Sequence, residues 1–321
     1  MPHIVVADPI HPDGIDRLAK APGVTLDHPG KPSNEELAER LRHADGLIVR
    51  GTVVDAALLK HAERLKVVCR HGVGYDLVDV PLLTKRGIAL MITPEANAAS
   101  VAEHALMLML SLARNVVPVS AAVRRGDWKV RGQSSTVELG GRNVLIIGFG
   151  RIGTRTAKRC AAMEMNVLVY DPYKPAADIK AAGCEPVDGL DAALPRADFV
   201  SIHCPKTPET IGMFNAARLR LMKPAAYLIN TARGGIVDEK ALYDALVSGR
   251  LAGAGLDVFE QEPPPKGHSL FALANVITAP HVAGVTVEAV DRMSEQTARN
   301  LLSALDGDPI RANVINQDVL G

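Results

Sequence analysis

Short runs rich in Val, Ile and Leu alternate with amphipathic stretches from the first residues of the chain. Helical patterns such as SNEELAERLRHA (33–44) and ALLKHAERL (57–65) separate the runs. The runs themselves predict strands: HIVVAD (3–8), VTLDH (24–28), GLIVR (46–50), KVVCR (66–70) and IALMIT (88–93). Strands that alternate with helices indicate a parallel sheet joined by crossover helices.

A second series of the same kind begins with RNVLIIGFGRIG (142–153). Its further strands are expected in NVLVYD (166–171), ADFVSIHC (197–204), AAYLIN (225–230), LAGAGLDVF (251–259) and NVITAP (275–280). The last helical pattern, 285–305, would return the chain to the first domain if the second domain is inserted into it. The sequence therefore predicts an α/β protein with two doubly wound, Rossmann-like parallel-sheet domains.

Two helix starts are predicted from capping-box spacing, one at Ser33 with Glu36 and one at Ser100 with Glu103. The second helix, ASVAEHALMLMLSLAR (99–114), is unusually apolar for a helix at a surface. We expect it to be buried between the two domains.

Composition narrows the class of protein. The chain has 321 residues, 36 basic and 36 acidic side chains, 47% hydrophobic residues and 22% charged ones. The length suggests about two domains, and the hydrophobic content is that of a folded globular protein. A formal net charge of zero argues against a nucleic acid or an acidic membrane surface as partner.

The N-terminus and the cysteines suggest a cytoplasmic protein. MPHIVVADPI carries no secretion signal, and the longest apolar run, 105–113, is far shorter than the roughly 20 residues that cross a bilayer. Neither a disulfide framework nor a metal site is indicated by the four scattered cysteines, Cys69, Cys160, Cys184 and Cys204. Free thiols in a reducing compartment fit this pattern.

A dinucleotide-binding fingerprint follows the first strand of the second series. Gly148 permits a tight turn, Gly150 allows a pyrophosphate to approach the backbone, and Gly153 lets the next helix pack closely on the strand. Asp171 ends the following strand, 18 residues after Gly153 and near the expected spacing of about 20. A carboxylate there would accept ribose hydroxyl groups and repel a 2′-phosphate, which favours NAD over NADP. The alternative is a glycine turn that binds nothing.

Three consecutive strands of the second series end in side chains suited to reduction of a 2-oxo acid. Arg233 would bind a carboxylate and polarise the adjacent ketone, His281 would act as general acid and base, and Glu262 would orient the imidazole. Each residue also has an ordinary interpretation. A histidine after a strand can be a packed residue, Arg233 can lie on the surface, and Glu262 can be a solvated acid beside Glu260. Only their joint placement favours catalysis. His43, His61 and His268 lie in polar contexts and receive no role.

Five motifs in order, GFGRIG with Asp171, HCP, NTARGGIVDE, LDVFEQEPP and PHVAG, resemble those of the D-isomer-specific 2-hydroxyacid dehydrogenases over nearly the whole chain. The chain is most similar to the phosphoglycerate dehydrogenase and hydroxypyruvate or glyoxylate reductase members. The resemblance implies a homodimer of NAD-dependent oxidoreductase subunits. It also implies a flavodoxin-like substrate domain (1–98 and 286–321) that carries an inserted NAD-binding Rossmann domain (99–285).

The resemblance also assigns residues. It implies that Arg233, Glu262 and His281 are catalytic, and that Arg50, Val73 and Gly74 bind substrate together with Arg233 and His281. An ordinary arginine at a strand end is the alternative for Arg50. The cofactor-binding residues that it implies are Gly148, Gly150, Arg151, Ile152, Gly153, Asp171, His203, Cys204, Pro205, Thr231, Ala232, Arg233, Asp257, His281 and Gly284.

Some positions depart from the family pattern. Leu77 stands where many relatives have asparagine, and His71 where a small residue is frequent, so the identity of the substrate stays open. Glu262 argues against formate oxidation, and because the sequence ends at Gly321 we expect no C-terminal regulatory domain. A second class of function, an NAD(H)-sensing interaction protein similar to the corepressors of this fold, is the alternative to an enzyme.

Overall fold

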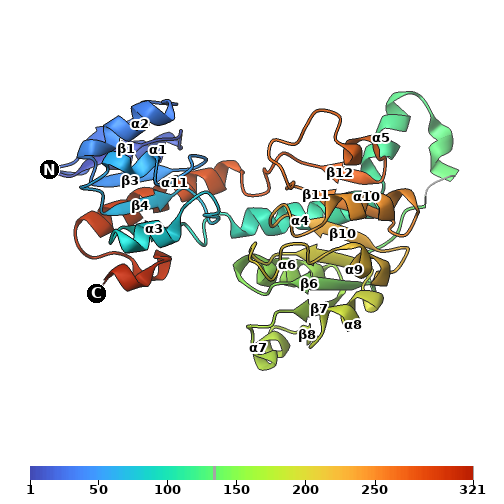
Figure 1. Cartoon of the computed structure of the whole chain (residues 1–321). Coiled ribbons are helices and arrows are strands. Elements are labelled where there is room, and N and C mark those ends of the chain that lie inside the picture. Colours follow the sequence, from blue (N-terminus) through green and yellow to red (C-terminus); the bar gives the residue numbers. More distant parts are fainter. Residues whose placement is uncertain (133–134, 321) are drawn as a thin grey trace. The chain divides into compact units, whose positions relative to one another are not determined.

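A computed structural model describes residues 1–132 and 135–320 of the chain (Figure 1). The chain divides into two compact units, Met1–Asn97 with Val285–Gly321, and Ala98–Gly284. Each change of unit lies one residue before the boundary expected from the sequence. Gly321, the last residue of the expected substrate domain, lies outside the described residues.

The first unit contains a sheet of five parallel strands in the order β2-β1-β3-β4-β5. The strands are β1 His3–Val6, β2 Thr25–Asp27, β3 Gly46–Val49, β4 Val67–Arg70 and β5 Ala89–Met91. Alternate residues of the strands enter two separate cores, since side chains of a strand point to opposite faces. Ile4 and Val6 pack with apolar residues of helices α1 (Pro12–Ala19) and α11 (Val287–Leu305), whereas Val5 packs with those of α2 (Asn34–Arg40) and α3 (Val80–Lys85). The order is that of flavodoxin-like folds, as expected.

The second unit contains seven parallel strands in the order β12-β11-β10-β9-β6-β7-β8. The strands are β6 Asn143–Ile147, β7 Asn166–Tyr170, β8 Glu185–Pro186, β9 Phe199–Ile202, β10 Tyr227–Asn230, β11 Gly253–Leu256 and β12 Val276–Thr278. β8 was not expected from the sequence, because two residues at a sheet edge produce no periodic pattern. This sheet is also covered on both faces, so the predicted α/β class with two doubly wound parallel sheets is confirmed.

The helices complete the layers around the two sheets (Figure 1). Those of the first unit are α1 Pro12–Ala19, α2 Asn34–Arg40, α3 Val80–Lys85 and α11 Val287–Leu305. Those of the second unit are α4 Ala98–Ala113, α5 Val116–Arg124, α6 Arg151–Ala162, α7 Ala176–Ala181, α8 Leu190–Ala193, α9 Ala216–Leu221 and α10 Glu239–Val247. Short 3₁₀ helices occur at 41–43, 58–61, 128–132, 194–196, 269–272, 311–313 and 317–320.

The apolar helix α4 packs against α6 and against strands β10 and β11 of its own unit. Small residues on β11 allow this close approach, since a Cβ added to Gly255 would lie 3.0 Å from Leu108 and one added to Gly253 would lie 3.3 Å from Leu112. The burial of α4 is thus explained by its own sheet. Its expected place between two domains stays a prediction.

Local sequence signals predicted one helix start correctly and one incorrectly. The capping box of Ser33 and Glu36 is formed at the start of α2. Helix α4, however, begins at Ala98 rather than after Ser100, because Ala98 is already fully buried and tertiary packing extends the helix past the capping signal. The amphipathic run 57–65 forms only a 3₁₀ helix, Leu58–His61.

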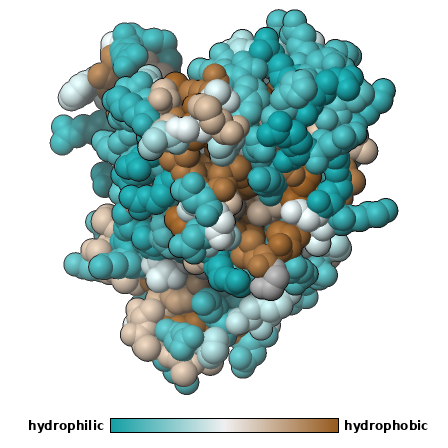
Figure 2. Space-filling model, turned by 90° about the vertical axis from the view of Figure 1, so that its left-hand side faces the viewer, coloured by the Kyte–Doolittle hydropathy of each residue, from teal (hydrophilic) through white to brown (hydrophobic). Residues whose placement is uncertain are grey.

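Within the described residues, no single helix is long and apolar enough to cross a membrane; α4 and α5 together meet the length and composition criteria but are bent by 60°. Hydrophilic residues cover most of the face that is drawn in Figure 2, and hydrophobic residues form smaller patches there.

Candidate active site

The two loops nearest to the centre of the seven-stranded sheet touch each other. The strand order reverses between β6 and β9, and the loops after these strands begin at Gly148 and His203. A Cβ added to Gly148 would lie 2.8 Å from the backbone nitrogen of Cys204. Ligands of open α/β sheets bind at such a reversal, outside the carboxyl ends of the strands.

The glycine turn has the conformation that the fingerprint requires. Gly148 has φ +90°, which L-residues with a side chain rarely adopt. A Cβ on Gly153 would lie 1.9 Å from the carbonyl oxygen of Gly148, whereas one on Gly150 would meet nothing within 4 Å. Gly150 is the N-cap of the 12-residue helix α6, whose first residues are Arg151 and Ile152. The turn therefore combines close packing at two glycines with open space at the helix N-terminus, where an anion is favoured.

Asp171 lies directly after β7 and beside this turn. Its Oδ2 accepts a hydrogen bond of 2.7 Å from the backbone N–H of Phe149, and its Oδ1 accepts one of 2.9 Å from Tyr173. Burial, with a smaller effect of the Asp171 charge, raises the pKa of the Cys204 thiol to about 11. Cys204 is therefore a neutral thiol close to the carboxylate.

Among the described residues, two polar atoms in the segments after β9 and β10 are buried without a hydrogen-bond partner. The Nε2 atom of His203 lies 2.9 Å from the Ser201 hydroxyl, but its Nδ1 has no hydrogen-bond partner among the described residues, and the same is true of the Thr231 hydroxyl. Burial lowers the pKa of His203 to about 3, so this imidazole is neutral. Unpartnered buried polar atoms at the carboxyl ends of β9 and β10 fit a bound dinucleotide that would supply the missing partners.

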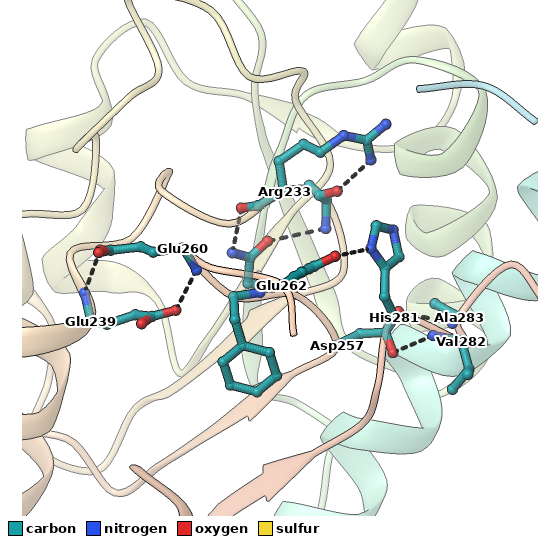
Figure 3. A network of polar contacts seen from close by, with 11 residues as sticks. Arg233, Glu239, Asp257, Glu260, Glu262, His281, Val282 and Ala283 are labelled. Carbon is teal, nitrogen blue, oxygen red and sulfur yellow. Dashed lines mark hydrogen bonds and ion pairs between the residues drawn. The ribbon is translucent and has the colours of Figure 1, made fainter. Parts of the chain in front are cut away.

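Glu262 and His281 form a hydrogen-bonded pair, as Figure 3 shows. The distance between Nδ1 of His281 and Oε2 of Glu262 is 2.6 Å, and the two side chains are 48% and 36% exposed. Oε1 of Glu262 accepts a second hydrogen bond, of 3.0 Å, from the backbone N–H of Phe259. Partial burial opposes ionisation, but these two hydrogen bonds and the charges of His281 and Arg233 hold the pKa of Glu262 below its ordinary value. Glu262 is thus a carboxylate that can keep a proton on Nδ1.

Arg233 lies in a turn that is held by Asn230. Oδ1 of Asn230 accepts a hydrogen bond of 3.0 Å from the N–H of Ala232, and its side-chain amide donates one of 2.9 Å to the carbonyl oxygen of Arg233. The Arg233 guanidinium donates to the carbonyl oxygen of Ala232 over 2.6 Å (Figure 3). Asn230 is 2% exposed and ends β10. The strand thereby fixes the backbone from which Arg233 extends.

Asp257 holds the segment that carries His281. It is fully buried, and its two carboxylate oxygens accept hydrogen bonds of 2.8 Å from the N–H groups of Val282 and Ala283 (Figure 3). The N–H of His281 donates to the Asp257 carbonyl over 2.8 Å. His281 has φ +53°, a left-handed conformation that non-glycine residues rarely adopt. These bonds maintain this backbone and leave the imidazole half-exposed. Gly284 follows as a partly buried residue.

Three of the residues that the resemblance assigns to substrate, Arg50, Val73 and Gly74, belong to the first unit. Among the described residues, the backbone N–H groups of Val73 and Gly74 donate no hydrogen bond, although both residues are half-buried. Burial, and then the charges of Arg50 and Arg70, lower the pKa of His71 to about 4. Arg50 is exposed, and the segment 50–52 is held by backbone hydrogen bonds to the Asp8 carboxylate. Basic groups and available N–H donors therefore gather at the ends of β3 and β4.

Sequence reasoning missed three residues of the site. Asn230 has a detectable signal, because an asparagine between a strand and a turn commonly bonds the backbone two residues on. His268 and Glu239, which form a hydrogen bond of 3.0 Å, have none, because they are 29 positions apart. His268, to which the sequence assigned no role, thus has a specific polar partner in the structure.

A doubly wound sheet with a glycine turn at its reversal point and an acid after the next strand defines a dinucleotide-binding protein. Residues 106–283 match the family described as "D-isomer specific 2-hydroxyacid dehydrogenase, NAD binding domain". The chain belongs to the D-isomer specific 2-hydroxyacid dehydrogenase family, as the sequence motifs predicted.

Named relatives extend over nearly all of the chain. This chain is 41% identical to a D-3-phosphoglycerate dehydrogenase of Methanocaldococcus jannaschii. The match covers 98% of this chain and 60% of that protein. The chain is 40% identical to a glyoxylate reductase of Thermofilum pendens, with 99% and 96% covered. A solved NADPH-dependent glyoxylate/hydroxypyruvate reductase of Sinorhizobium meliloti, in complex with NADP and malonate, is 30% identical, with 99% and 98% covered and a TM-score of 0.88. The chain thus spans about 60% of the length of the phosphoglycerate dehydrogenase and nearly all of the reductases.

Proposed function

We propose that this chain is an NAD-dependent dehydrogenase that interconverts a small D-2-hydroxy acid and the corresponding 2-oxo acid. The observation that supports this most strongly is the hydrogen bond of 2.6 Å between Glu262 and the Nδ1 atom of the half-exposed His281. It is the arrangement of a general acid and base whose second nitrogen is available to a substrate. The names of the relatives indicate the same class of reaction.

The cofactor, when bound, would accept or supply a hydride at its nicotinamide ring. We assign the phosphates to the glycine turn and the start of α6, and the adenosine ribose to Asp171, whose carboxylate favours NAD over NADP. The residues of this cofactor site are Gly148, Gly150, Arg151, Ile152, Gly153, Asp171, His203, Cys204, Pro205, Thr231, Ala232, Arg233, Asp257, His281 and Gly284. The unpartnered Thr231 hydroxyl and His203 Nδ1 support this assignment.

His281 would move the proton of the reaction. In reduction, its protonated Nε2 donates a proton to the substrate oxygen, and in oxidation the neutral Nε2 removes a proton from the hydroxyl group. Glu262 keeps the other ring nitrogen protonated and stabilises the imidazolium, since a carboxylate favours the charged form of a neighbouring base. Arg233 has several N–H donors besides the one on the Ala232 carbonyl, and we assign it to the carboxylate and carbonyl oxygens of the substrate.

Arg50, Val73 and Gly74 would contribute the remaining contacts to the substrate. The N–H groups of Val73 and Gly74 suit a carboxylate, because consecutive backbone donors form anion-binding concavities. The proximity of Arg50, Arg70 and His71 supports a substrate with a second anionic group. A phosphorylated or sulfonated 2-oxo acid is of this type.

A substrate panel tests the proposed function. NADH would be mixed with glyoxylate, hydroxypyruvate, phosphohydroxypyruvate and bulkier 2-oxo acids, and its oxidation followed at 340 nm. We expect turnover with at least one of these acids. Binding of NADH without oxidation by any of them would reject the dehydrogenase and favour the alternative, an NAD(H)-sensing interaction protein.

We further propose that the protein is a homodimer in the cytoplasm. Support for a second copy as partner comes from exposed apolar side chains on α5 and the 3₁₀ helix after it, of which Val117 is 58% and Trp128 is 70% exposed. Surfaces of this kind often mark an interface. Support for a reducing compartment comes from the four cysteines, which are all free thiols. Sedimentation of the wild type at the mass of one 34.1 kDa chain would contradict the dimer.

A further inference from the structure

A second histidine–glutamate pair lies at the start of α10. The Nε2 atom of His268 is 3.0 Å from Oε2 of Glu239, and the two side chains are only 13% and 15% exposed. Such burial is unusual for a surface ion pair, and α10 does not require it, because Asp238 caps that helix with a hydrogen bond of 2.9 Å to the N–H of Ala241. The role of Glu239 and His268 must therefore be sought in their contacts outside α10.

Glu239 is bonded reciprocally to Glu260 (Figure 3). Oε1 of Glu239 accepts a hydrogen bond of 2.7 Å from the backbone N–H of Glu260, and Oε1 of Glu260 accepts one of 3.1 Å from the backbone N–H of Glu239. Charge-assisted hydrogen bonds of this kind are the stronger ones in proteins. The Glu239 carboxylate thus fixes the peptide between Phe259 and Glu260.

His268 packs against the side chain of Phe259, the first residue of this peptide. Its ring lies edge-on to Phe259, with ring centres 5.8 Å apart, and both rings contact Phe271. Phe259 is 5% exposed. The pair therefore holds Phe259 by its ring and holds the following N–H by a carboxylate.

Phe259, the residue that is held in this way, also directs a donor at Glu262 from its own backbone N–H. The N–H of Phe259 donates to Oε1 of Glu262, whose other oxygen binds His281. The backbone here also lies against the turn of Arg233, because a Cβ on Gly234 would lie 1.7 Å from the carbonyl oxygen of Phe259. A displacement of this peptide by a few tenths of an ångström would change the orientation of Glu262.

We propose that Glu239 and His268 are positioning residues, which hold the backbone and ring of Phe259 and thereby orient Glu262 toward His281. Their role rests on the proposed dehydrogenase function, because they matter to catalysis only if the Glu262–His281 pair does the acid–base chemistry. The charged or titratable groups that face Glu262 are His281 and Arg233, and those that face Glu239 are His268 and the Glu260 carboxylate.

Two kinds of variant separate positioning from a merely structural role. Glu239→Ala and His268→Leu remove the contacts, whereas Glu239→Gln and His268→Gln keep a polar atom within reach of the same partners. Lys240→Ala is the matched control, because it removes an exposed ion pair of 2.7 Å with Asp244 on the same helix. Circular dichroism would confirm that each variant is folded.

The pH profile of kcat/KM is the decisive measurement. The Phe259 N–H lowers the pKa of Glu262, so its loss makes this carboxylate take up a proton at higher pH. We expect Glu239→Ala and His268→Leu to move the acid limb of the profile upward by about half to one pH unit. We also expect kcat to fall by about tenfold, with a smaller change in KM. Glu239→Gln, His268→Gln and Lys240→Ala should stay near the wild type.

Hydrogen–deuterium exchange gives a second readout that needs no substrate. The amides of Phe259 and Glu260 should exchange at least about tenfold faster in Glu239→Ala and His268→Leu, the two variants that remove the contacts, than in the wild type. An unchanged acid limb and kcat, or equal impairment in the removing and conservative variants, would overturn the proposal. If the wild type reduces none of the panel acids, the proposed function fails, and exchange alone then decides: unchanged exchange of these amides would overturn the positioning role as well.

Discussion

The two sheets of this protein share an architecture but carry different chemistry at the carboxyl ends of their strands. In the seven-stranded sheet, His281 is matched by Glu262, and Asp257 by two backbone N–H groups. In the five-stranded sheet, basic groups gather instead. Arg50 and Arg70 lie close enough to His71 to lower its pKa.

The difference teaches how to distinguish a proton-transfer site from an anion-binding one. A matched acid–base pair can exchange a proton without a large change in the net charge of its surroundings. Under the proposed function, an anionic group of the substrate would add to the contacts of Arg50 and Arg70. His71, which is neutral because it is buried and lies near the charges of Arg50 and Arg70, adds a hydrogen-bonding group without adding a third charge. Variants at His281, Asp171 and Arg50 should distinguish the proposed proton-transfer residues from the proposed anion-binding ones, with effects that decrease in that order.

Removal of the imidazole should have the largest effect. We expect His281→Asn to reduce kcat by about 10²- to 10⁴-fold, since this is the usual contribution of a general acid or base, with NADH binding retained. Steady-state kinetics and a fluorescence titration with NADH would measure the two quantities. The matched control is His61→Asn, which alters a partly exposed histidine whose Nε2 lies 3.4 Å from Glu39. Equal kcat in the wild type and His281→Asn would show that His281 does not transfer the proton.

A change at the cofactor acid should have an intermediate effect. Asp171→Ala removes the carboxylate that we assign to the ribose, and with it the repulsion of a 2′-phosphate. We expect the ratio of kcat/KM for NADH to that for NADPH to fall by about 10- to 100-fold, which corresponds to the loss of a charge-assisted hydrogen bond. The exposed acid Asp178, changed to Ala, is the control. An unchanged ratio would remove Asp171 from the ribose site.

The smallest effect is expected at the basic end of the five-stranded sheet. Arg50 is exposed, so solvent screens its charge. We expect Arg50→Ala to reduce the preference for a phosphorylated or sulfonated 2-oxo acid over glyoxylate by about fivefold, measured as a ratio of kcat/KM values. Arg42→Ala, at an exposed arginine paired with Glu39, serves as the reference. An identical preference in Arg50→Ala and the wild type would show that these basic groups do not recognise a second anion.

The sheets and the glycine turn were predictable because their signals are local. Alternating strands and helices gave both sheets, and the glycine spacing gave a turn in which Gly148 and Gly153 make the close contacts that the pattern requires. The placement of Glu262 and His281 after consecutive strands also pointed to this pair, which the structure joins by a hydrogen bond. The start of α4 was misplaced because packing overrode a local capping signal.

The supporting contacts were not predictable from the chain alone. Asp257 bonds the backbone 25 and 26 positions away, and Glu239 bonds a backbone amide 21 positions away. Such bonds depend on where two loops lie after folding, and a backbone N–H is present at every residue except proline. His268 illustrates this limit, because its polar neighbours in sequence gave no indication of Glu239.

The return of the chain to its first unit has a consequence for synthesis. Helix α11 supplies Ala298 and Leu301 to the core beneath β1 and β4, and Asn316 accepts a hydrogen bond of 2.8 Å from the N–H of Leu90. The strands of the first unit therefore lack one covering layer until residues 287–316, which follow the whole second unit in the sequence, have been synthesised. Domains generally fold as units during synthesis. We therefore expect the second unit to reach its native state first, because the first unit cannot complete its core before α11 has been synthesised.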